Sequence, residues 1–235
     1  MSTPSLPELR QVVLLTGDLE GTLSTIRSAF GVPAGFRDVE GMGAVGFNHE
    51  VVGFDRTYLE VCEPKDPESP LGRKTAEKGD SGFMVVVQVP HADGMRQRAD
   101  ELGFSPIVAK EHHGNPLSQW HPRDFGTLAE FDEIRPATSW HFAPDVYDAR
   151  STSVVLDISA VRLSVPDPAA MAHRWATVAG GTVNDNGTSV DLTGRTVHFA
   201  DLPGSRGLKT VECVARDRGR VGETHRICGV DFVLV

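Results

Sequence analysis

The feature that most constrains this fold is a pattern that recurs along the chain. The strand patterns at 56–62 and 127–134 both contain Thr-x-x-Glu, which places Glu60 and Glu130 at equivalent positions, and Lys209–Cys213 is a relative one residue shorter. Recurrence at a period of about 70 residues indicates an internal repeat of one supersecondary unit. We therefore expect a series of similar modules.

Each repeat also opens with the same order of elements. Strand patterns begin at Gln11, Met84 and Ala160, and each is followed by a Gly or Pro break, a helical pattern and a terminating Gly. In the first repeat we expect Asp18 to cap the helix and Gly31 to end it. One helix for every three or four strands predicts an α+β fold of repeated βαβββ modules, with helices on one face of a mixed sheet.

The repeats define the expected domains. A single curved sheet leaves one face open, so we expect residues 8–63 and 80–135 to pair and form a cavity within 8–135. The charged, Pro-containing stretch 64–80 is expected to be a connection. Residues 136–156 are then a linker, and 157–235 a third, partly degenerate module with a C-terminal strand extension. That extension is either the remnant of a fourth module, or the third module pairs with its copy in a homodimer.

Composition limits the partners. The net charge of −9 and the pI near 5.4 argue against nucleic acid or an anionic membrane surface as the main partner. No apolar run is long enough to span a bilayer, and the N-terminus has no apolar signal core. The three cysteines contain no CxxC pair, which is typical of reduced thiols in a cytoplasmic protein.

Three stretches resemble the vicinal oxygen chelate superfamily, whose members include glyoxalase I, methylmalonyl-CoA epimerase, extradiol dioxygenases and metal-free antibiotic-binding proteins. They are QVVLLTGDL at 11–19, YLEV at 58–61 and HPRDFGTLAE at 121–130. The last is similar to the ending found in the epimerases. The resemblance implies the glyoxalase/bleomycin-resistance/dioxygenase fold, in which two paired modules surround a divalent metal.

The resemblance also implies a set of metal ligands on the first and fourth strands of the paired modules. Carried over, these positions are Gln11, Glu60, Met84 and Glu130. The implied metal is one divalent ion such as Zn, Ni, Co, Mn or Mg. Met84 departs from the pattern, because a thioether is a poor ligand for a hard cation. Either a water or a displaced histidine, His113 or His121, completes the site, or Met84 fills the pocket and no metal binds. In the second case His113 lies in an exposed loop and His121 caps a turn.

Two functions follow from these alternatives. The first is a metal-assisted isomerase, epimerase or lyase that acts on a small oxygenated acid or thioester, with Glu60 and Glu130 as acid–base groups. The second is a metal-free protein that sequesters a small molecule. A dioxygenase is disfavoured because both first-strand histidines of its usual iron site are missing. Side chains expected to line the pocket are Met84, Tyr58, Phe47, Phe83, Trp120 and Phe125.

Non-catalytic interpretations accompany these residues. Glu60 can simply pair with Arg56 on a half-buried strand. Glu130 can belong to an exposed acidic rim with Asp132 and Glu133. The aromatic residues can be core rather than pocket.

Overall fold

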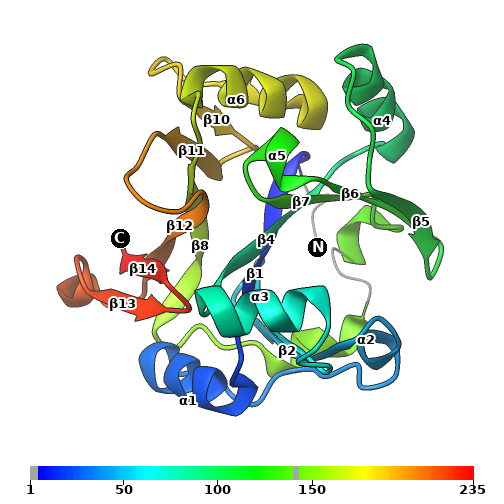
Figure 1. The fold of residues 1–235 in the computed structure, drawn as a ribbon. Coiled ribbons are helices and arrows are strands. Elements are labelled where there is room, and N and C mark those ends of the chain that lie inside the picture. Colours follow the sequence, from blue (N-terminus) through cyan, green and yellow to red (C-terminus); the bar gives the residue numbers. More distant parts are fainter. Residues whose placement is uncertain (1–4, 140–142) are drawn as a thin grey trace. The chain divides into compact units, whose positions relative to one another are not determined.

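A computed structural model describes residues 5–139 and 143–235, which form two compact units that are each discontinuous in sequence (Figure 1). We name each unit after one of its helices. The α1 unit comprises Gln11–Phe83, Asp145–Ile158 and Lys209–Val235. The α6 unit comprises Met84–Pro144, Ser159–Leu208 and the N-terminal segment up to Arg10. The predicted division at 136–156 follows the repeats along the chain, and residues 140–142 of that linker lie outside the described part.

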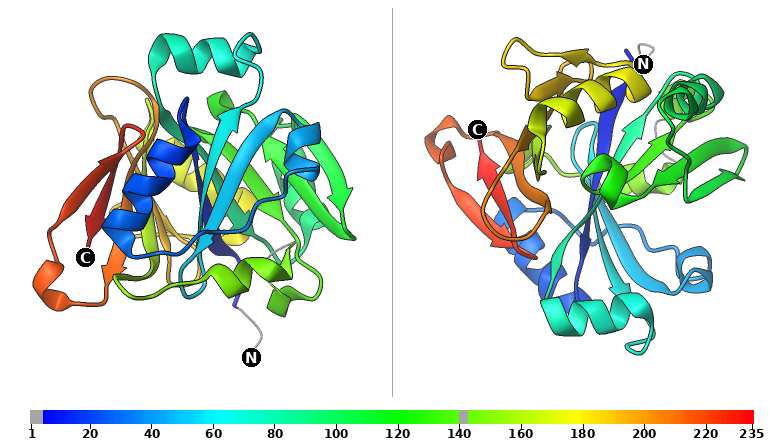
Figure 2. Two further views of the ribbon diagram at one scale, coloured as in Figure 1. Left: turned by 90° about the horizontal axis from the view of Figure 1, so that it is seen from below. Right: turned by 45° about the horizontal axis from the view of Figure 1, so that its top comes forward.

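The α1 unit contains two groups of hydrogen-bonded strands, in the orders β2-β3-β1 and β13-β14-β12. Helix α1 packs on β3 and on β13, and Figures 1 and 2 both show it beside β13. The elements are β1 (Glu8–Leu15, which begins in the α6 unit), α1 (Leu19–Phe30), α2 (Gly41–Ala44), β2 (Phe47–Gly53), β3 (Tyr58–Pro64), α3 (Pro70–Lys78), η2 (Pro144–Ala149), β12 (Gly207–Ala215), η4 (Arg218–Arg220), β13 (Thr224–Ile227) and β14 (Val230–Leu234).

The α6 unit repeats this construction with the strand orders β4-β7-β6-β5 and β8-β11-β10-β9. Helix α6 packs on β10 and β11, and α4 packs on β6. The elements are β4 (Ser81–Gln88, which begins in the α1 unit), α4 (Ala92–Glu101), β5 (Val108–His112), β6 (Asn115–Trp120), α5 (Pro122–Phe125), β7 (Leu128–Asp132), η1 (Ala137–Ser139), β8 (Val155–Ser164, which also begins in the α1 unit), α6 (Pro168–Trp175), η3 (Ala176–Gly180, a π-helical turn), β9 (Thr182–Val183), β10 (Ser189–Asp191) and β11 (Thr196–Ala200).

One pairing rule occurs four times. The first strand of each module pairs in parallel with the last, as β1 with β3, β4 with β7, β8 with β11 and β12 with β14. The remaining strands join antiparallel. The predicted α+β class with repeated βαβββ modules is therefore confirmed. The fourth repeat is shortened, because the short 3-10 turn η4 follows β12 where the other modules have an α-helix.

Local sequence explains where α1 starts and stops. The Asp18 side chain accepts a hydrogen bond from the Gly21 N–H, and Gly31 ends the helix with a φ of 64°. A carboxylate cap satisfies an N–H group that lacks a helical partner, and glycine adopts the left-handed conformation without a Cβ penalty. Leu19, Leu23 and Ile26 recur at helical spacing and are buried. Both predicted boundaries are confirmed.

The stretch 64–80 differs from the prediction. It contains α3, whose N-cap Ser69 accepts a hydrogen bond from the Gly72 N–H and whose first residue is Pro70. Proline at this position costs no hydrogen bond, because the first N–H groups of a helix have no intrahelical acceptor. One of the prolines that suggested a loop, Pro70, therefore marks the start of a helix.

Each unit has its own aromatic core. In the α1 unit, the Phe30 ring lies 6.3 Å from Phe54 and 5.5 Å from Phe232, measured between centroids. In the α6 unit, Trp175 contacts three phenylalanines, with centroid distances of 6.0 Å to Phe125, 5.7 Å to Phe131 and 5.9 Å to Phe199. None of the described helices has the length and hydrophobicity that crossing a bilayer requires.

Candidate functional site

Glu60 lies on β3 in the α1 unit, where its carboxylate has a donor on each side. The Gln11 amide Nε2 on β1 donates to Glu60 Oε2 over 2.7 Å, and His49 Nδ1 on β2 lies 2.6 Å from Oε1. Strand register brings these side chains to one face, because β3 is central between β1 and β2. Glu60 is 6% exposed, and its side-chain hydrogen bonds run to Gln11 and His49. It is therefore oriented by the neighbouring strands.

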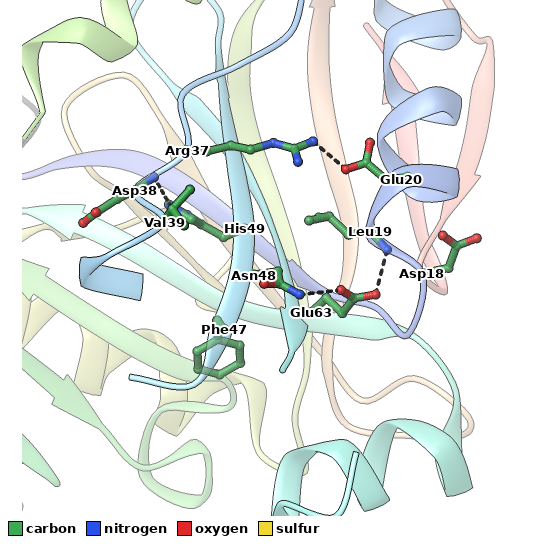
Figure 3. A pocket seen from close by; sticks show the side chains of 10 residues that line it. All are labelled: Asp18, Leu19, Glu20, Arg37, Asp38, Val39, Phe47, Asn48, His49 and Glu63. Carbon is green, nitrogen blue, oxygen red and sulfur yellow. Dashed lines mark hydrogen bonds and ion pairs between the residues drawn. The ribbon is translucent and has the colours of Figure 1, made fainter. Parts of the chain in front are cut away.

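His49 is a site residue that the sequence did not reveal. Its Nε2 accepts a hydrogen bond of 2.8 Å from the Asp38 backbone N–H, as Figure 3 shows. A neutral imidazole has one donor and one acceptor nitrogen, so this contact assigns the proton to Nδ1, which then donates to Glu60. The ring is 6% exposed and held at both nitrogens. Its side chain therefore fixes the position of the Glu60 carboxylate.

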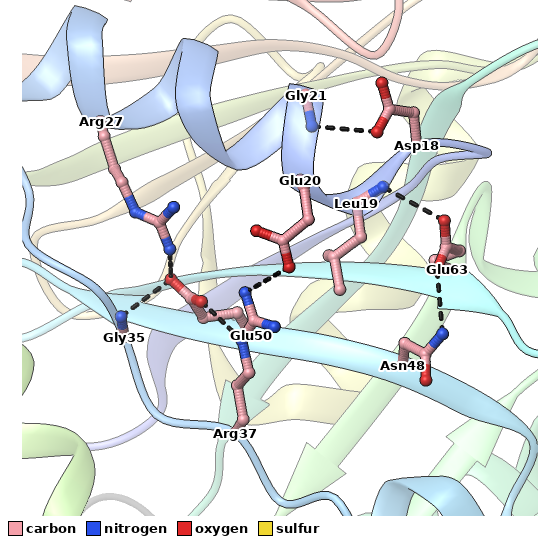
Figure 4. A network of polar contacts seen from close by, with 10 residues as sticks. All are labelled: Asp18, Leu19, Glu20, Gly21, Arg27, Gly35, Arg37, Asn48, Glu50 and Glu63. Carbon is pink, nitrogen blue, oxygen red and sulfur yellow. Dashed lines mark hydrogen bonds and ion pairs between the residues drawn. The ribbon is translucent and has the colours of Figure 1, made fainter.

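The adjacent residue Glu50 points to the opposite face of β2. It accepts hydrogen bonds from Arg27 at 2.5 Å, from the Gly35 N–H at 2.8 Å and from Arg37 at 2.8 Å (Figure 4). Burial alone would raise the pKa of Glu50, but these three donors outweigh it and hold the pKa below its usual value. Glu50 is a buried, ionised anchor for α1 and for the segment that precedes α2.

Glu130 occupies the equivalent strand position in the α6 unit but has different surroundings. The Gln119 amide Nε2 on β6 donates to Glu130 Oε2 over 2.6 Å. Asp132 lies two residues further along β7 on the same face and also interacts with Glu130 by a hydrogen bond. Glu130 is 8% and Asp132 4% exposed. The pair is buried, so Asp132 is not part of an exposed acidic rim.

The buried surroundings of Asp132 favour its protonated form. Burial and then the charge of Glu130 raise the pKa of Asp132 well above its usual value. Among the described residues, Asp132 Oδ1 has no hydrogen-bond partner although it is buried. Burial of this kind favours the protonated form of a carboxyl group, and that form can donate to a neighbouring carboxylate. Glu133, by contrast, pairs with Arg135 over 2.7 Å.

The other predicted ligand positions are distributed as follows. Met84 is buried on β4 and registers with Leu128 on β7. His113 is exposed and has a φ of 49° in the turn between β5 and β6. His121 caps α5, where its Nδ1 accepts the Arg123 N–H over 3.0 Å.

After α5, Gly126 adopts a φ of 78°, and a Cβ there would lie 2.6 Å from Val165 Cγ1, so the turn requires glycine.

The aromatic candidates fall into two classes. Trp120 and Phe125 are fully buried in the core of the α6 unit, with a centroid distance of 5.4 Å, and Tyr58 is fully buried in the α1 unit. Phe47 and Phe83 are partly exposed and lie 6.2 Å apart. Phe47 also lines a pocket at the edge of β2, together with His49 (Figure 3).

Whether these residues fit a divalent metal depends on the donors that each unit offers. In the α1 unit both Glu60 oxygens already accept N–H groups, and in the α6 unit the first-strand position holds the thioether of Met84. Across residues 5–139 and 143–235, no three His, Cys, Asp or Glu side chains gather as a metal site. Since hard divalent ions require several convergent oxygen or nitrogen donors, the set within either unit does not fit one.

Solved structures resemble the chain at low identity. A Staphylococcus aureus hypothetical protein is 9% identical, with a TM-score of 0.70 over 98% of this chain and 99% of its own. The Mycobacterium tuberculosis methylmalonyl-CoA epimerase is 19% identical, with a TM-score of 0.48 over 59% of this chain and 97% of its own. A Streptomyces coelicolor epimerase in complex with 2-nitronate-propionyl-CoA gives 19% and 0.47, over 55% of this chain and 98% of its own. The first of these shows a similar fold over nearly the whole chain.

A comparison with curated proteins gave no match. The family comparison was positive: the model of the glyoxalase-like domain matches residues 12–179, which is more than half of the chain. This range includes Glu60, His49 and Glu130 and two of the three predicted module starts, Met84 and Ala160. The chain therefore belongs to the glyoxalase-like domain family, in agreement with the resemblance seen in the sequence.

Proposed function

We propose that this chain is an enzyme that moves a proton on a carbon beside a carbonyl group, as an isomerase, epimerase or lyase of a small oxygenated acid or thioester. The observation that carries the proposal is the buried Glu60 carboxylate, oriented by Gln11 and His49. A general base needs a fixed direction and a restricted supply of water. Glu60 has both, because it is 6% exposed and bound on two sides.

In this mechanism Glu60 takes the proton from the substrate carbon and returns it to the same or a neighbouring carbon. Both donors keep their contacts while the carboxylate changes its charge, since His49 is itself anchored by the Asp38 N–H. The proposal assigns Glu130 as the second acid–base group, supported by Gln119 and by Asp132, whose pKa is raised by burial and by the charge of Glu130. That Gln11, Glu60 and Glu130 act on one substrate rests on the resemblance to the superfamily.

The proposal is tested by proton exchange. The full chain is incubated in D₂O with 2-hydroxy acids, 2-oxo acids and their thioesters, and deuterium incorporation beside the carbonyl is followed by NMR. We expect incorporation into one class of substrate and its loss in Glu60→Gln. Equal rates of deuterium exchange in the wild-type chain and in Glu60→Gln would show that Glu60 is not the base.

The divalent metal implied by the resemblance is tested separately, because the donors within each unit do not fit it. Metal content is measured after incubation with Mn, Ni, Co or Zn, beside Glu130→Ala. We expect less than stoichiometric binding and no difference between the two proteins. One metal per chain that is lost in Glu130→Ala would instead support the metal-assisted reaction.

A second candidate function is supported by Met84. A buried thioether where the superfamily carries a metal ligand suits a metal-free protein that binds a small molecule. This function would be favoured if one of the acids or thioesters in the exchange assay binds to the chain but takes up no deuterium. The proposal further includes a cytoplasmic location and a homodimer. Light scattering on the purified chain measures its molar mass and so tests the homodimer.

A further inference from the structure

A pocket with a volume of about 240 Å³ lies in the α1 unit, between the N-terminus of α1 and the edge strand β2 (Figure 3). It is formed by residues within 18–63 and contains neither Glu60 nor Gln11. It is smaller than the usual pockets for drug-sized ligands, which measure about 300–1,000 Å³. Its occupant is therefore a small molecule, and the chemistry of the walls indicates its class.

The one cation that lines the pocket is already neutralised. Arg37 donates to Glu20 over 2.7 Å and to the buried Glu50 over 2.8 Å, as Figure 4 shows. Both of its partners are anions, so the positive charge of the guanidinium is already neutralised. These ion pairs connect the segment before α2 to α1 and β2. An anionic ligand would have to replace one of these contacts.

Three further carboxylates line the pocket and accept only neutral donors in the described structure. Glu63 accepts the Leu19 N–H at 3.3 Å and the Asn48 amide at 2.9 Å. Asp18 accepts the Gly21 N–H, and Asp38 accepts the Gly41 N–H. These contacts orient the carboxylates and leave their negative charge without a counter-ion. The pocket therefore has an excess of negative charge.

The remaining wall is apolar. Leu19 is buried at the N-terminus of α1. Val39 is 72% exposed in the turn before α2, and Phe47 is partly exposed on β2. A metal ion gains nothing from such a wall, and no metal-binding cluster occurs in the part of the chain that the structure describes. A molecule with an apolar body and a positive end satisfies both kinds of wall, and an aromatic ring such as Phe47 also attracts a cation.

We propose that this pocket binds a small organic cation, namely a primary amine or ammonium group on a short hydrocarbon or aromatic body. The positive end lies near Glu63, and the apolar body lies against Leu19, Val39 and Phe47. This site is distinct from the Glu60 site, although His49 lines the pocket and also contacts Glu60. The proposal does not depend on the reaction assigned to Glu60.

The test compares three probes of the same shape. Benzylamine in its ammonium form, benzyl alcohol and benzoate are titrated into the full chain, and the methyl signals of Leu19 and Val39 are followed by NMR. We expect the ammonium to bind at least about tenfold more tightly than the other two, as an uncompensated charge predicts. We also expect its binding to weaken with added salt.

Variants locate the charge. We expect Glu63→Gln to weaken ammonium binding about fivefold, since it removes one partly exposed ion pair. Glu77→Gln makes the same charge change on the exposed face of α3 and should leave the affinity unchanged. Equal losses of ammonium affinity in both variants would show that the effect of charge is long-range, and would overturn the proposed site near Glu63.

Because Glu63 also holds Leu19 and Asn48, a second pair of variants keeps the test independent of folding. Val39 is exposed, so Val39→Lys and Val39→Gln should both fold. We expect the lysine to weaken ammonium binding at least about threefold more than glutamine, because it places a like charge at the pocket. Equal affinities in these two variants, or probe binding without shifts at Leu19 and Val39, would overturn the proposal.

Discussion

The α1 and α6 units place a glutamate at the same strand position and surround it in opposite ways. Glu60 is held by a histidine and an amide, and its neighbour Glu50 on the next strand is held by two arginines. Glu130 is held by an amide and by a second carboxyl group, Asp132. All four are buried.

The difference teaches that a repeated motif does not repeat its chemistry. Thr-x-x-Glu delivers a carboxyl group to the same face of each module, but residues on other strands decide its charge and mobility. Partners that donate favour the charged form, whereas a neighbouring carboxylate favours the protonated form. In the proposed function, the α1 unit supplies a fixed base and the α6 unit supplies a carboxyl pair that holds a proton.

The largest expected effect compares the two glutamates directly. In the exchange assay we expect Glu60→Gln to lower the rate by about 10²–10⁴-fold, the usual contribution of a general base. Glu130→Gln should cost less, about tenfold, because Asp132 remains as a second carboxyl group on the same face. Equal losses would break the comparison and make the two carboxylates a single functional pair.

The next effect concerns Glu50 and is a change in stability. We expect Glu50→Gln to lower the free energy of unfolding by roughly 2 kcal/mol, since a buried carboxylate loses its charge while Arg27 and Arg37 can still reach water. The measurement is urea unfolding at several pH values. The pKa of Glu50 is lowered in the folded state, so its stabilisation is present above the unfolded pKa and is lost as the pH falls through the folded pKa. The gap between wild type and variant should therefore close in acid, and a gap that widens would contradict the assignment.

A smaller effect separates the two nitrogens of His49. The amide of His49→Asn retains a donor near the Nδ1 position, whereas that of His49→Gln retains an acceptor near the Nε2 position. We expect the exchange rate to fall about tenfold more in His49→Gln, because one charge-assisted hydrogen bond to Glu60 is worth about 1.5 kcal/mol. The same rate in both variants would show that His49 does not orient Glu60.

The smallest effect is a pH dependence in the α6 unit. Because the pKa of Asp132 is raised on folding, wild-type stability falls as the pH rises from the unfolded pKa through the folded one. Asp132→Asn cannot titrate, so its stability relative to wild type should increase with pH, by about 1 kcal/mol between mildly acidic and alkaline solution. Thermal unfolding over this range gives the difference, and a constant difference would show that Asp132 is not the shifted group.

Features that depend on near neighbours were predicted well from the sequence. The ends of α1 follow from Asp18 and Gly31, and the module order follows from alternating apolar residues. Helix α3 was missed although Ser69 and Pro70 are starting signals, because prolines were taken as loop formers. The family resemblance was correct, and it pointed to Gln11, Glu60 and Glu130 but not to the partners His49 and Gln119.

His49 and Asp132 show why the site could not be completed from sequence. His49 lies in a Gly-rich stretch with weak strand signals, and only the antiparallel register of β2 with β3 brings it to Glu60. The acidic sequence around Asp132 suggests an exposed rim, yet the tertiary structure buries Asp132 beside Glu130. Whether a carboxyl group is charged depends on desolvation and on donors from distant parts of the chain.

The sequence by itself determined the repeated βαβββ module, its helix boundaries and the two strand glutamates, because these depend on periodicity and on capping within a few residues. The tertiary structure alone decided which segments form each compact unit and which partners Glu60 and Glu130 receive. The physical reason is that burial and hydrogen-bond geometry arise only when strands distant in sequence become neighbours.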